Sequence, residues 1–355
     1  MTARAQPAAA ALDSPDITIS ATADALEWDT HVASHREATA YHRWAWRAIF
    51  HEAFGHASHY LVARRHGRVV GGLPIVAFRS RVFGDFAVSL PFVNYGGVVA
   101  DDAEAAAALV NEAVRWARRE RLSHVELRHL LPKAAPWPAK RHKVAMWLPI
   151  GPDEAAAWAR LDRKVRNQVR KAEKAGLRTE IGGLELVNAF YQVFSTNMRD
   201  LGTPVYGKNF FETIVRSLPD SARVFVVSLD RTPIAAAVTI RWRDTVEVPW
   251  ASSLKAHNDK SPNMLLYWTM LKAAMAQGAE RFDFGRSTPD EGTFHFKRQW
   301  GATPHPLVWE YAGLDGALPD QSPSNPKFRL AIAIWQRLPL AVANRLGPAV
   351  VRNIP

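Results

Sequence analysis

The chain has 355 residues, and 45 Lys and Arg against 34 Asp and Glu give it a formal net charge of +11. With 48% hydrophobic residues it can bury the core of one large domain or two ordinary ones, which excludes disorder throughout. It has no cysteine, and this excludes disulfides, cysteine-ligated zinc, iron–sulfur clusters and a cysteine nucleophile.

The excess of positive charge points to an anionic partner: nucleic acid, a phosphate-bearing substrate or an acidic lipid surface. Residues 1–18 are predicted to be a disordered lead-in, because their Ala-rich stretch is short and poor in Leu, Ile and Val. No window approaches the roughly 18–20 apolar residues of a spanning helix. We therefore expect a soluble cytoplasmic protein, with peripheral contact at the inner membrane face left open.

Two stretches of the chain follow one plan. The first runs through a strand, a turn at 66–67 and a second strand to a helix over about 102–120 and a strand over 124–128. The second repeats this order with a turn at 230–231, a helix over about 262–277 and a strand over 281–284. Equivalent points such as Arg128 and Gly285 lie 157 positions apart. This indicates a duplicated mixed α/β unit, with domains at 19–150 and 151–312.

A basic helix is predicted between the copies, over residues 154–176. Trp158, Leu161, Val165, Val169 and Ala172 follow the spacing of one apolar helix stripe. Residues 163–174 carry six basic side chains and one acid, on a different face. The helix is predicted to bind phosphates through Lys164, Arg166 and Arg170, and the alternative is a solvated charged face.

Residues 313–355 read as a Pro/Ser/Gly-rich linker followed by an amphipathic tail. Arginines at 329, 337, 345 and 352 alternate with Leu, Ile and Val, and Pro339 interrupts the pattern. Docking of the tail on its own protein is the favoured prediction. The alternative is that it lies on an anionic membrane face with its arginines toward the headgroups.

Several segments, taken in order, resemble a known family. They are AFGHASHYLVA with GGLPIVAF, SLPFVNYGGVV, LDRKVRNQVRKAEKAGL, NMRDLGTPVYGKNFF, FDFGRST and GTFHFKRQWGATPHPLVWEY, and they span about 54–311. They resemble tandem GNAT-like (acyl-CoA N-acyltransferase fold) domains of the Fem-type, FemAB-like aminoacyl transferases, in particular the type that accompanies exopolysaccharide and PEP-CTERM sorting systems. The resemblance implies an α/β fold with two GNAT-like domains and transfer of an acyl group to an amine.

The segment FHFKRQWG carries the first catalytic candidate. Fem-type transferases have a lysine in a similar FK-x-x-x-G context, and the resemblance implies that Lys297 faces the reacting centre. Acyl transfer builds negative charge on the carbonyl oxygen, and a fixed cation there stabilises it. The alternative is a surface lysine whose stem covers Trp300.

The strand FDFGRS carries the second candidate. Phe282 and Phe284 are predicted to point to one face and Asp283 to the other. Asp283 could take the proton of an attacking amine, with Arg286 binding substrate beside it. The alternative is a structural Asp–Arg pair at the end of a strand.

Two loops supply further binding candidates. The resemblance implies that the loop NMRDLGTPVYG approaches the acceptor, which makes Arg199 and Tyr206 substrate-binding residues; the alternative is a connector whose tyrosine packs on the domain. In the first copy FVNYGG offers Tyr95. Its adjacent glycines, 96 and 97, fit either close backbone approach to a ligand or a plain bend.

Metal and bound cofactors are not expected. His51 and His56 are five positions apart, whereas the metalloprotease helix motif needs four. Walker-type and dinucleotide-binding glycine motifs do not occur in the sequence, so nucleotide hydrolysis and dinucleotide binding have no support. The resemblance implies an aminoacyl-tRNA donor, and acyl-CoA is the alternative. A predicted acidic start of the first long helix disfavours CoA, while Ser261 is the expected N-cap of the second. The lack of a coiled-coil insertion weakens the case for tRNA.

The sequence therefore predicts an N-acyl or aminoacyl transferase acting on a phosphate-bearing envelope precursor, of peptidoglycan or exopolysaccharide. Aminoacyl-tRNA is a possible partner, and DNA is not expected. One alternative is an acyl-CoA-dependent enzyme that modifies a sugar amine or a protein. Another is a non-catalytic basic adaptor of a polysaccharide or sorting system.

Overall fold

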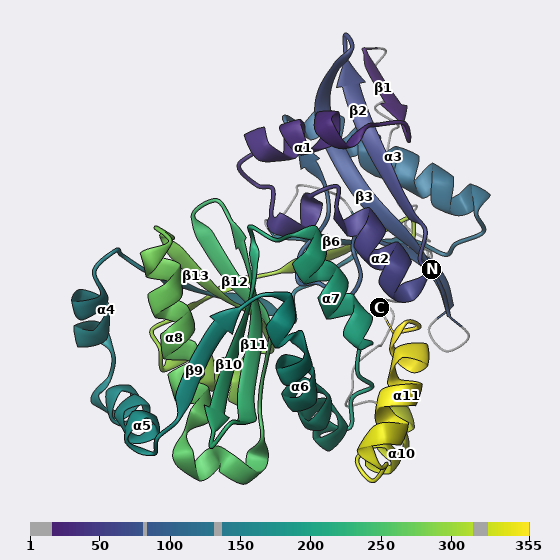
Figure 1. The fold of residues 1–355 in the computed structure, drawn as a ribbon. Helices are drawn as coiled ribbons and strands as arrows, with labels where there is room; N and C mark the ends of the chain where they lie inside the picture. The colour runs from purple at the N-terminus through teal and green to yellow at the C-terminus, as the bar shows by residue number, and fades with distance from the viewer. Residues whose placement is uncertain (1–15, 81–83, 131–136, 315–325, 355) are drawn as a thin grey trace, which may run out of the picture.

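Two mixed β-sheets with helices on their faces make up the computed structural model, which describes residues 16–80, 84–130, 137–314 and 326–354 (Figure 1). The elements up to residue 150 are β1 (Ile17–Ser20), α1 (Ala25–Ser34), the 3₁₀ turn η1 (Ala40–His42), α2 (Trp46–Phe54), β2 (Ser58–Arg65), β3 (Arg68–Ser80), β4 (Gly84–Val88), β5 (Val99–Ala100), α3 (Ala103–Arg119), β6 (Val125–His129), β7 (Ala139–Lys140) and β8 (Val144–Pro149).

The elements after residue 150 begin with two short helices and end with two more. They are α4 (Glu154–Arg160), α5 (Arg163–Lys174), β9 (Arg178–Gly182), η2 (Leu184–Leu186), α6 (Val187–Leu201), α7 (Lys208–Ser217), β10 (Ala222–Leu229), β11 (Thr232–Trp242), β12 (Thr245–Ser253), η3 (Lys255–Lys260), α8 (Pro262–Ala276), β13 (Arg281–Ser287), α9 (Gly292–Arg298), β14 (Thr303–Pro306), β15 (Val308–Ala312), α10 (Pro326–Trp335) and α11 (Leu340–Val351).

The two sheets repeat one topology, as the duplication in the sequence predicts. The first contains the order β1-β2-β3-β4-β6 and the second β9-β10-β11-β12-β13. In each run only the last pair is parallel, and a long helix, α3 or α8, lies between its two strands in the chain. The predicted mixed α/β fold class is therefore confirmed.

The halves exchange one strand each. β8, from the segment before residue 150, pairs antiparallel with β13 in the second sheet. β15, from the end of the second copy, pairs antiparallel with β6 in the first sheet. The neighbouring short strands stay in the sheet of their own half, where each pairs with the exchanged strand: β14 with β8, and β7 with β15. The domain limits at 150 and 312 remain a prediction, but the hydrogen bonding of the sheets crosses both halves.

The two predicted hairpin turns are confirmed, and their backbone explains their sharpness. His66 and Gly67 have φ of 51° and 79°, and Arg65 pairs with Arg68 across the turn. Asp230 and Arg231 have φ of 48° and 66°. Two consecutive left-handed residues form the two-residue turn whose twist matches that of the flanking strands.

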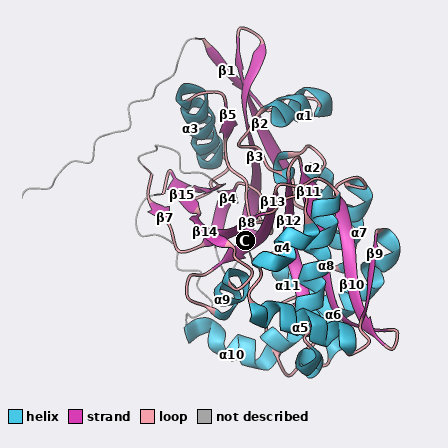
Figure 2. Ribbon diagram, turned by 90° about the vertical axis from the view of Figure 1, so that its left-hand side faces the viewer, coloured by secondary structure: helices cyan, strands magenta, loops and turns pink. Residues whose placement is uncertain are grey.

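Each sheet has one face toward a long helix and one toward a shared core. α3 covers the first sheet and α8 and α5 cover one face of the second, while α6 lies on the other face of the second sheet and α2 and α7 pack on each other between the halves (Figures 1 and 2). The shared core combines Phe50 and Phe78 of the first half with Phe210 and Trp250 of the second. One hydrophobic core therefore joins both halves.

The helices depart from the sequence prediction at two places. The predicted helix over 154–176 is two helices, because α4 ends before Leu161 and α5 begins after Asp162. Its apolar stripe is still correct, since Val165, Val169 and Ala172 are fully buried. Ser261 is at the N-cap position of α8, as predicted, but its backbone is left-handed (φ 56°) and its side chain makes no capping hydrogen bond with a described residue.

The tail after residue 326 folds back on the protein as α10 and α11. Asn344 Nδ2 donates to Ser195 Oγ at 3.3 Å, and Arg199 Nη1 donates to the Leu338 carbonyl at 3.1 Å. Gly347 lies so close to Val205 that an added Cβ would stand 2.8 Å from its carbonyl oxygen. Docking, the favoured prediction, is confirmed. In the described part of the chain, a helix with the length and apolarity needed to cross a bilayer was not found.

Candidate active site

Two carboxylates meet where the parallel strands of the second sheet separate. β12 and β13 pair only over Thr245–Glu247 and Arg281–Asp283, and the last pair is Glu247 opposite Asp283. Both side chains are buried, at 6% and 3% exposure. Phe282 and Phe284 point to the opposite face, into the core beneath α8, so the predicted alternation is confirmed.

Asp283 is held by three donors from three parts of the chain. Its Oδ2 accepts from the Tyr95 hydroxyl at 2.6 Å and from Trp147 Nε1 at 3.0 Å. Its Oδ1 accepts from the backbone N–H of Gly285 at 2.7 Å. Tyr95 belongs to the first half and Trp147 to the exchanged strand β8, so the exchange of strands builds this site.

Burial makes the charged form of the carboxylate pair costly. Loss of solvent raises the pKa of Asp283, against the hydrogen bond from Tyr95. Burial and the neighbouring charge of Asp283 raise the pKa of Glu247 well above its usual range, although Asn94 donates to it at 2.6 Å. Two adjacent buried carboxyl groups disfavour ionisation of both at once.

Lys297 lies beside this pair rather than at the surface. The residue is 8% exposed, and its Nζ donates to the carbonyls of Gly285 at 3.2 Å and Arg286 at 2.9 Å. Burial lowers the pKa of Lys297 to about 8, an effect that the charge of Asp283 opposes. The exposed-lysine alternative is therefore wrong. An ammonium has three N–H donors, and these carbonyls use two of them.

We call Glu247, Asp283, Lys297 and the side chains around them the cluster. Two arginines, one from each half, lie next to these residues. The guanidinium carbons of Arg128 and Arg286 lie 4.5 and 5.1 Å from the ring centroid of Trp309, on the exchanged strand β15. Arg128 Nε donates to Glu126 at 2.7 Å. The Nη1 atom of Arg286 is buried and has no hydrogen-bond partner among the described residues. Burial, with the nearby charge of Arg128, lowers the pKa of Arg286 to about 10.

Tyr206 lies on the arginine side of the cluster. Its ring packs against Phe54 and Phe210 in the shared core. Burial raises the pKa of its hydroxyl, and the positive charges of Arg286 and Arg128 act in the opposite direction. Of the residues selected from the sequence, Lys297, Asp283, Arg286, Tyr95 and Tyr206 therefore come together.

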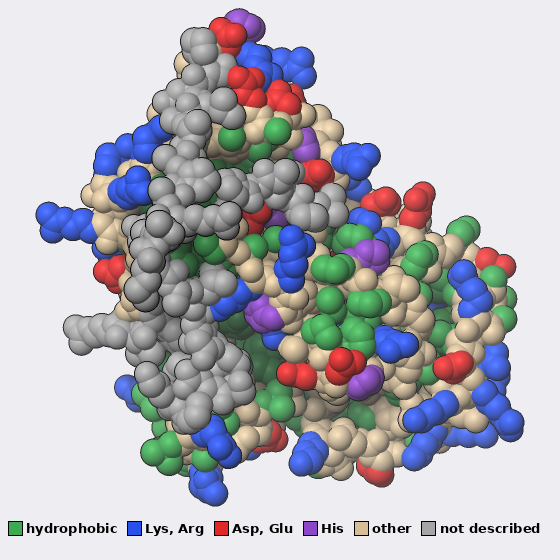
Figure 3. Space-filling model, turned by 180° about the vertical axis from the view of Figure 1, so that it is seen from behind, with side chains coloured by type: hydrophobic (Ala, Val, Ile, Leu, Met, Phe, Trp, Pro, Cys, Tyr) green, Lys and Arg blue, Asp and Glu red, His purple; other side chains and the backbone are tan. Residues whose placement is uncertain are grey.

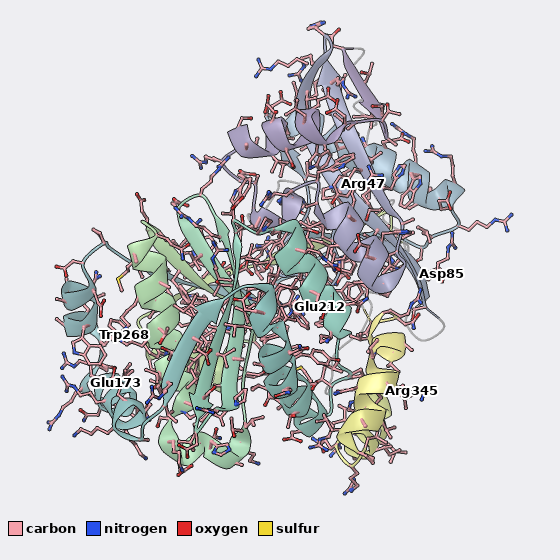
Figure 4. The ribbon with its side chains drawn as sticks, in the orientation of Figure 1. Arg47, Asp85, Glu173, Glu212, Trp268 and Arg345 are labelled. Atoms are coloured by element: carbon pink, nitrogen blue, oxygen red, sulfur yellow. The ribbon has the colours of Figure 1, made fainter. Side chains whose placement is uncertain are left out.

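The other selected residues lie elsewhere. Arg199 donates to Asp200 and to the tail, so it joins α6 to the C-terminal helices. Lys164, Arg166 and Arg170 are on α5, which packs on α8, whereas the cluster lies on the opposite face of the second sheet. Figure 4 places Glu173 of α5 and Trp268 of α8 at the left edge of the molecule, and Figure 3 shows basic side chains gathered at lower right, on the same side.

The adjacent glycines near Tyr95 serve protein contacts. A Cβ at Gly97 (φ 93°) would stand 2.4 Å from the His129 ring, and one at Gly96 would stand 2.3 Å from the Ser89 carbonyl oxygen. The close approach predicted from the sequence is thus to the chain itself. It lets the segment carrying Asn94 and Tyr95 enter the gap between β12 and β13.

Sequence reasoning missed several members of the cluster, among them Glu247, Asn94, Trp147 and Trp309. One further residue could have been found from the duplication. Glu126 is 157 positions before Asp283, and it occupies the same place in the first sheet, at the last paired position of the parallel strands β4 and β6. Each half therefore carries a buried carboxylate where its parallel strands separate.

Of the two histidines compared with the metalloprotease motif, His56 has a protein partner, as does the nearby His59. His56 Nε2 lies 3.0 Å from the Arg352 carbonyl oxygen, and His59 stacks on Trp116. Within the described residues, no group of three or more His, Asp and Glu side chains is placed to hold a metal ion.

Comparison with protein families identifies the segment that contains most of the cluster. Residues 159–298 match the model of the acetyltransferase (GNAT) domain. This segment includes Glu247, Asp283, Arg286 and Lys297, so the match to the GNAT domain covers most of the cluster. A comparison with curated protein sequences gave no match.

Solved structures share the fold over nearly the whole chain. FemX matches with a TM-score of 0.66 and 16% identity over 89% of this chain and 100% of its own. The C-terminal domain of a putative lysylphosphatidylglycerol synthetase from Agrobacterium fabrum matches with 0.57 and 14% over 82% and 92%. A tandem GNAT protein from the clavulanic acid biosynthesis pathway matches with 0.50 and 11% over 85% and 100%. The chain is thus similar in fold to tandem GNAT proteins.

Proposed function

We propose that this protein transfers an acyl or aminoacyl group to an amine of a phosphate-bearing cell-envelope precursor. The observation that carries the proposal is Lys297: its buried ammonium donates to two backbone carbonyls, lies beside a buried pair of carboxyl groups, and belongs to the segment that matches the acetyltransferase (GNAT) domain. The similarity in fold to FemX supports the aminoacyl form of the reaction.

The reaction needs no nucleophile from the protein. The acceptor amine attacks the carbonyl carbon of the donor ester, and the resulting oxyanion is stabilised by the Lys297 ammonium. The carbon–oxygen bond to the donor then breaks as the amide forms. The proton lost by the amine passes to the leaving oxygen, through Asp283 or directly. An acyl-CoA donor would follow the same steps with a thiolate as leaving group.

The phosphate-bearing acceptor is supported by the arginines beside the cluster. Arg286 has a buried Nη1 without a partner among the described residues, and Arg128 lies over the same indole ring. Guanidinium groups with free donors bind phosphate oxygens strongly. The basic helix α5 would hold a more distant phosphate group of the donor or acceptor. An association with PEP-CTERM or exopolysaccharide systems stays a prediction.

The test is a transfer assay with the full chain, labelled aminoacyl-tRNA or acyl-CoA, and an amine-bearing peptidoglycan precursor that carries a diphosphate. We expect label in the precursor, and a loss of at least about 100-fold in kcat for Lys297→Met. Arg298→Met is the matched control, because Arg298 is the next residue of α9 and is exposed. A fully active Lys297→Met enzyme would contradict the assigned role.

Running the assay with each donor separately distinguishes the proposed function from the two alternative functions. Transfer from acyl-CoA alone, with thermal stabilisation by CoA but not by aminoacyl-tRNA, would favour the CoA-dependent enzyme. The observation behind this candidate is the similarity in fold to the tandem GNAT protein of the clavulanic acid biosynthesis pathway, whose structure was determined without AcCoA. Absence of transfer, together with strongly salt-dependent binding of generic RNA that Lys297→Met leaves unchanged, would favour the adaptor.

A further inference from the structure

The outer side of the C-terminal helices carries exposed apolar side chains. Leu330 and Ile334 on α10 are 72% and 54% exposed. On α11 the exposed fractions are 40% for Val342, 47% for Leu346 and 40% for Val350. In each helix these residues are four positions apart and form one stripe. We call these five residues the tail stripe.

The tail stripe is separate from the stripe that docks α11 on the protein. Ala343, Gly347 and Val351 are buried, and each is one position after a member of the tail stripe. One position corresponds to about 100° around a helix, so docking leaves the tail stripe uncovered. The buried residues already hold α11 against the protein, so the exposed apolar residues of the tail stripe are not needed for this docking.

The charged side chains of the tail itself are all positive. Arg329, Arg337, Arg345 and Arg352 are exposed, and residues 326–355 contain no Asp or Glu. Among the described residues, none of these arginines lies within ion-pair distance of a carboxylate. Figure 4 labels Arg345 on the outer side of α11, and Figure 3 shows hydrophobic and basic side chains together at lower left.

We propose that α10 and α11 dock this protein on an anionic lipid bilayer, with the tail stripe in the headgroup layer and the arginines on lipid phosphates. Apolar side chains combined with unpaired arginines fit an acidic bilayer surface, which satisfies both. The two helices lie at the margin of the molecule (Figure 1). The proposal does not depend on the transfer reaction, and it would bring a site that uses an envelope precursor close to the membrane.

The test is flotation of the full chain with vesicles of phosphatidylcholine containing about 30% phosphatidylglycerol, and with phosphatidylcholine alone. We expect binding to the anionic vesicles only. Leu346→Glu and Leu330→Glu should each weaken it at least about tenfold. Leu26→Glu is the control, because Leu26 is 79% exposed but lies on α1. Urea unfolding checks that every variant remains folded.

Two single arginine substitutions test whether vesicles bind at the tail or are attracted only by the net charge of +11. Arg345→Gln should weaken vesicle binding about fivefold. Arg118→Gln, an exposed arginine on α3, should leave it unchanged. Equal effects of the two, equal binding to neutral vesicles, or no binding at all would each overturn the proposal. So would a dimer in solution that Leu346→Glu dissociates, since a second copy would then cover the stripe.

Discussion

Lys297 is buried, and its ammonium lies between two backbone carbonyls and the carboxyl groups of Asp283 and Glu247. Its ammonium is held by the Gly285 and Arg286 carbonyls, and burial brings its pKa down to about 8. A lysine with this pKa is still mostly protonated at neutral pH. It can therefore stabilise an oxyanion there, and it loses that ability over a pH range that is easy to reach.

The pH dependence of transfer should report this group. We expect kcat to fall above pH about 8, as the ammonium loses its proton. In Lys297→Arg this fall should move beyond pH 10, because a guanidinium keeps its charge. The measurement is the pH–rate profile of both proteins with one donor. A wild-type profile that stays flat up to pH 10 would show that another group carries the effect.

Stability should also depend on Lys297, and in a defined direction. The folded pKa of about 8 is below the usual 10.5, so between these values the unfolded chain binds more protons than the folded one. The free energy of unfolding of the protein therefore rises with pH across that window. This gain in stability is fully present above about pH 10.5, and it is lost as the pH falls to about 8. Urea unfolding at pH 8 and 10 should show the rise in wild type and its absence in Lys297→Met.

At the scale of elements, the loop before β5 is held by close packing of its backbone at Gly97 against the His129 ring. Gly97 has φ 93°, and a Cβ there would stand 2.4 Å from His129. Gly84 has a similar φ of 84°, but a Cβ there meets open space. At both positions the positive φ would strain any L-residue, and the two differ only in whether an added Cβ would clash with a neighbour.

We expect Gly97→Ala to lower the free energy of unfolding by about 2–4 kcal/mol. Gly84→Ala should cost only about 1–2 kcal/mol, the left-handed strain of an L-residue. Urea midpoints of the two variants measure the difference. Equal losses would mean that the His129 ring moves aside freely, and that the loop does not rely on this contact.

The basic helix α5 lies on the other face of the second sheet from the cluster, so its contribution should be to binding. Changing Lys164, Arg166 and Arg170 to Gln should raise KM for the phosphate-bearing substrate on the order of tenfold, with kcat nearly unchanged. The control removes three exposed basic residues outside α5, Arg36, Arg118 and Lys255. If both triple variants raise KM equally, α5 is only a solvated charged face.

At the scale of the whole molecule, the exchange of strands and the shared core make the two copies one folding unit. β8 and β15 each belong to the sheet of the other half, and the largest core contains side chains from both. Without the other half, each sheet would lack one of its strands. Such coupling predicts cooperative unfolding.

We expect a single calorimetric transition that coincides with the loss of tryptophan fluorescence and of circular dichroism. Gly97→Ala in the first half and Phe284→Ala in the second should both shift this same transition. Two separate transitions, each sensitive to only one of the substitutions, would show that the halves unfold independently.

The sequence alone determined the features that depend on local geometry. The alternation of Phe282, Asp283 and Phe284 follows from the period of a strand, and both hairpin turns follow from short-range backbone preference. The duplication was visible as the spacing of 157 positions, and the same spacing contains the relation of Glu126 to Asp283. The break at 161–162 was missed, because the apolar stripe continues across it.

Only the tertiary structure decided which residues meet. Tyr95, Trp147 and Trp309 reach the cluster because strands paired across the two halves, and such pairing depends on contacts between residues far apart in the chain. Arg199 and Arg286 have equally suggestive surroundings in sequence, yet one joins the tail and the other lies in the cluster. A local pattern fixes the direction of a side chain relative to its own element, whereas packing fixes what that element faces.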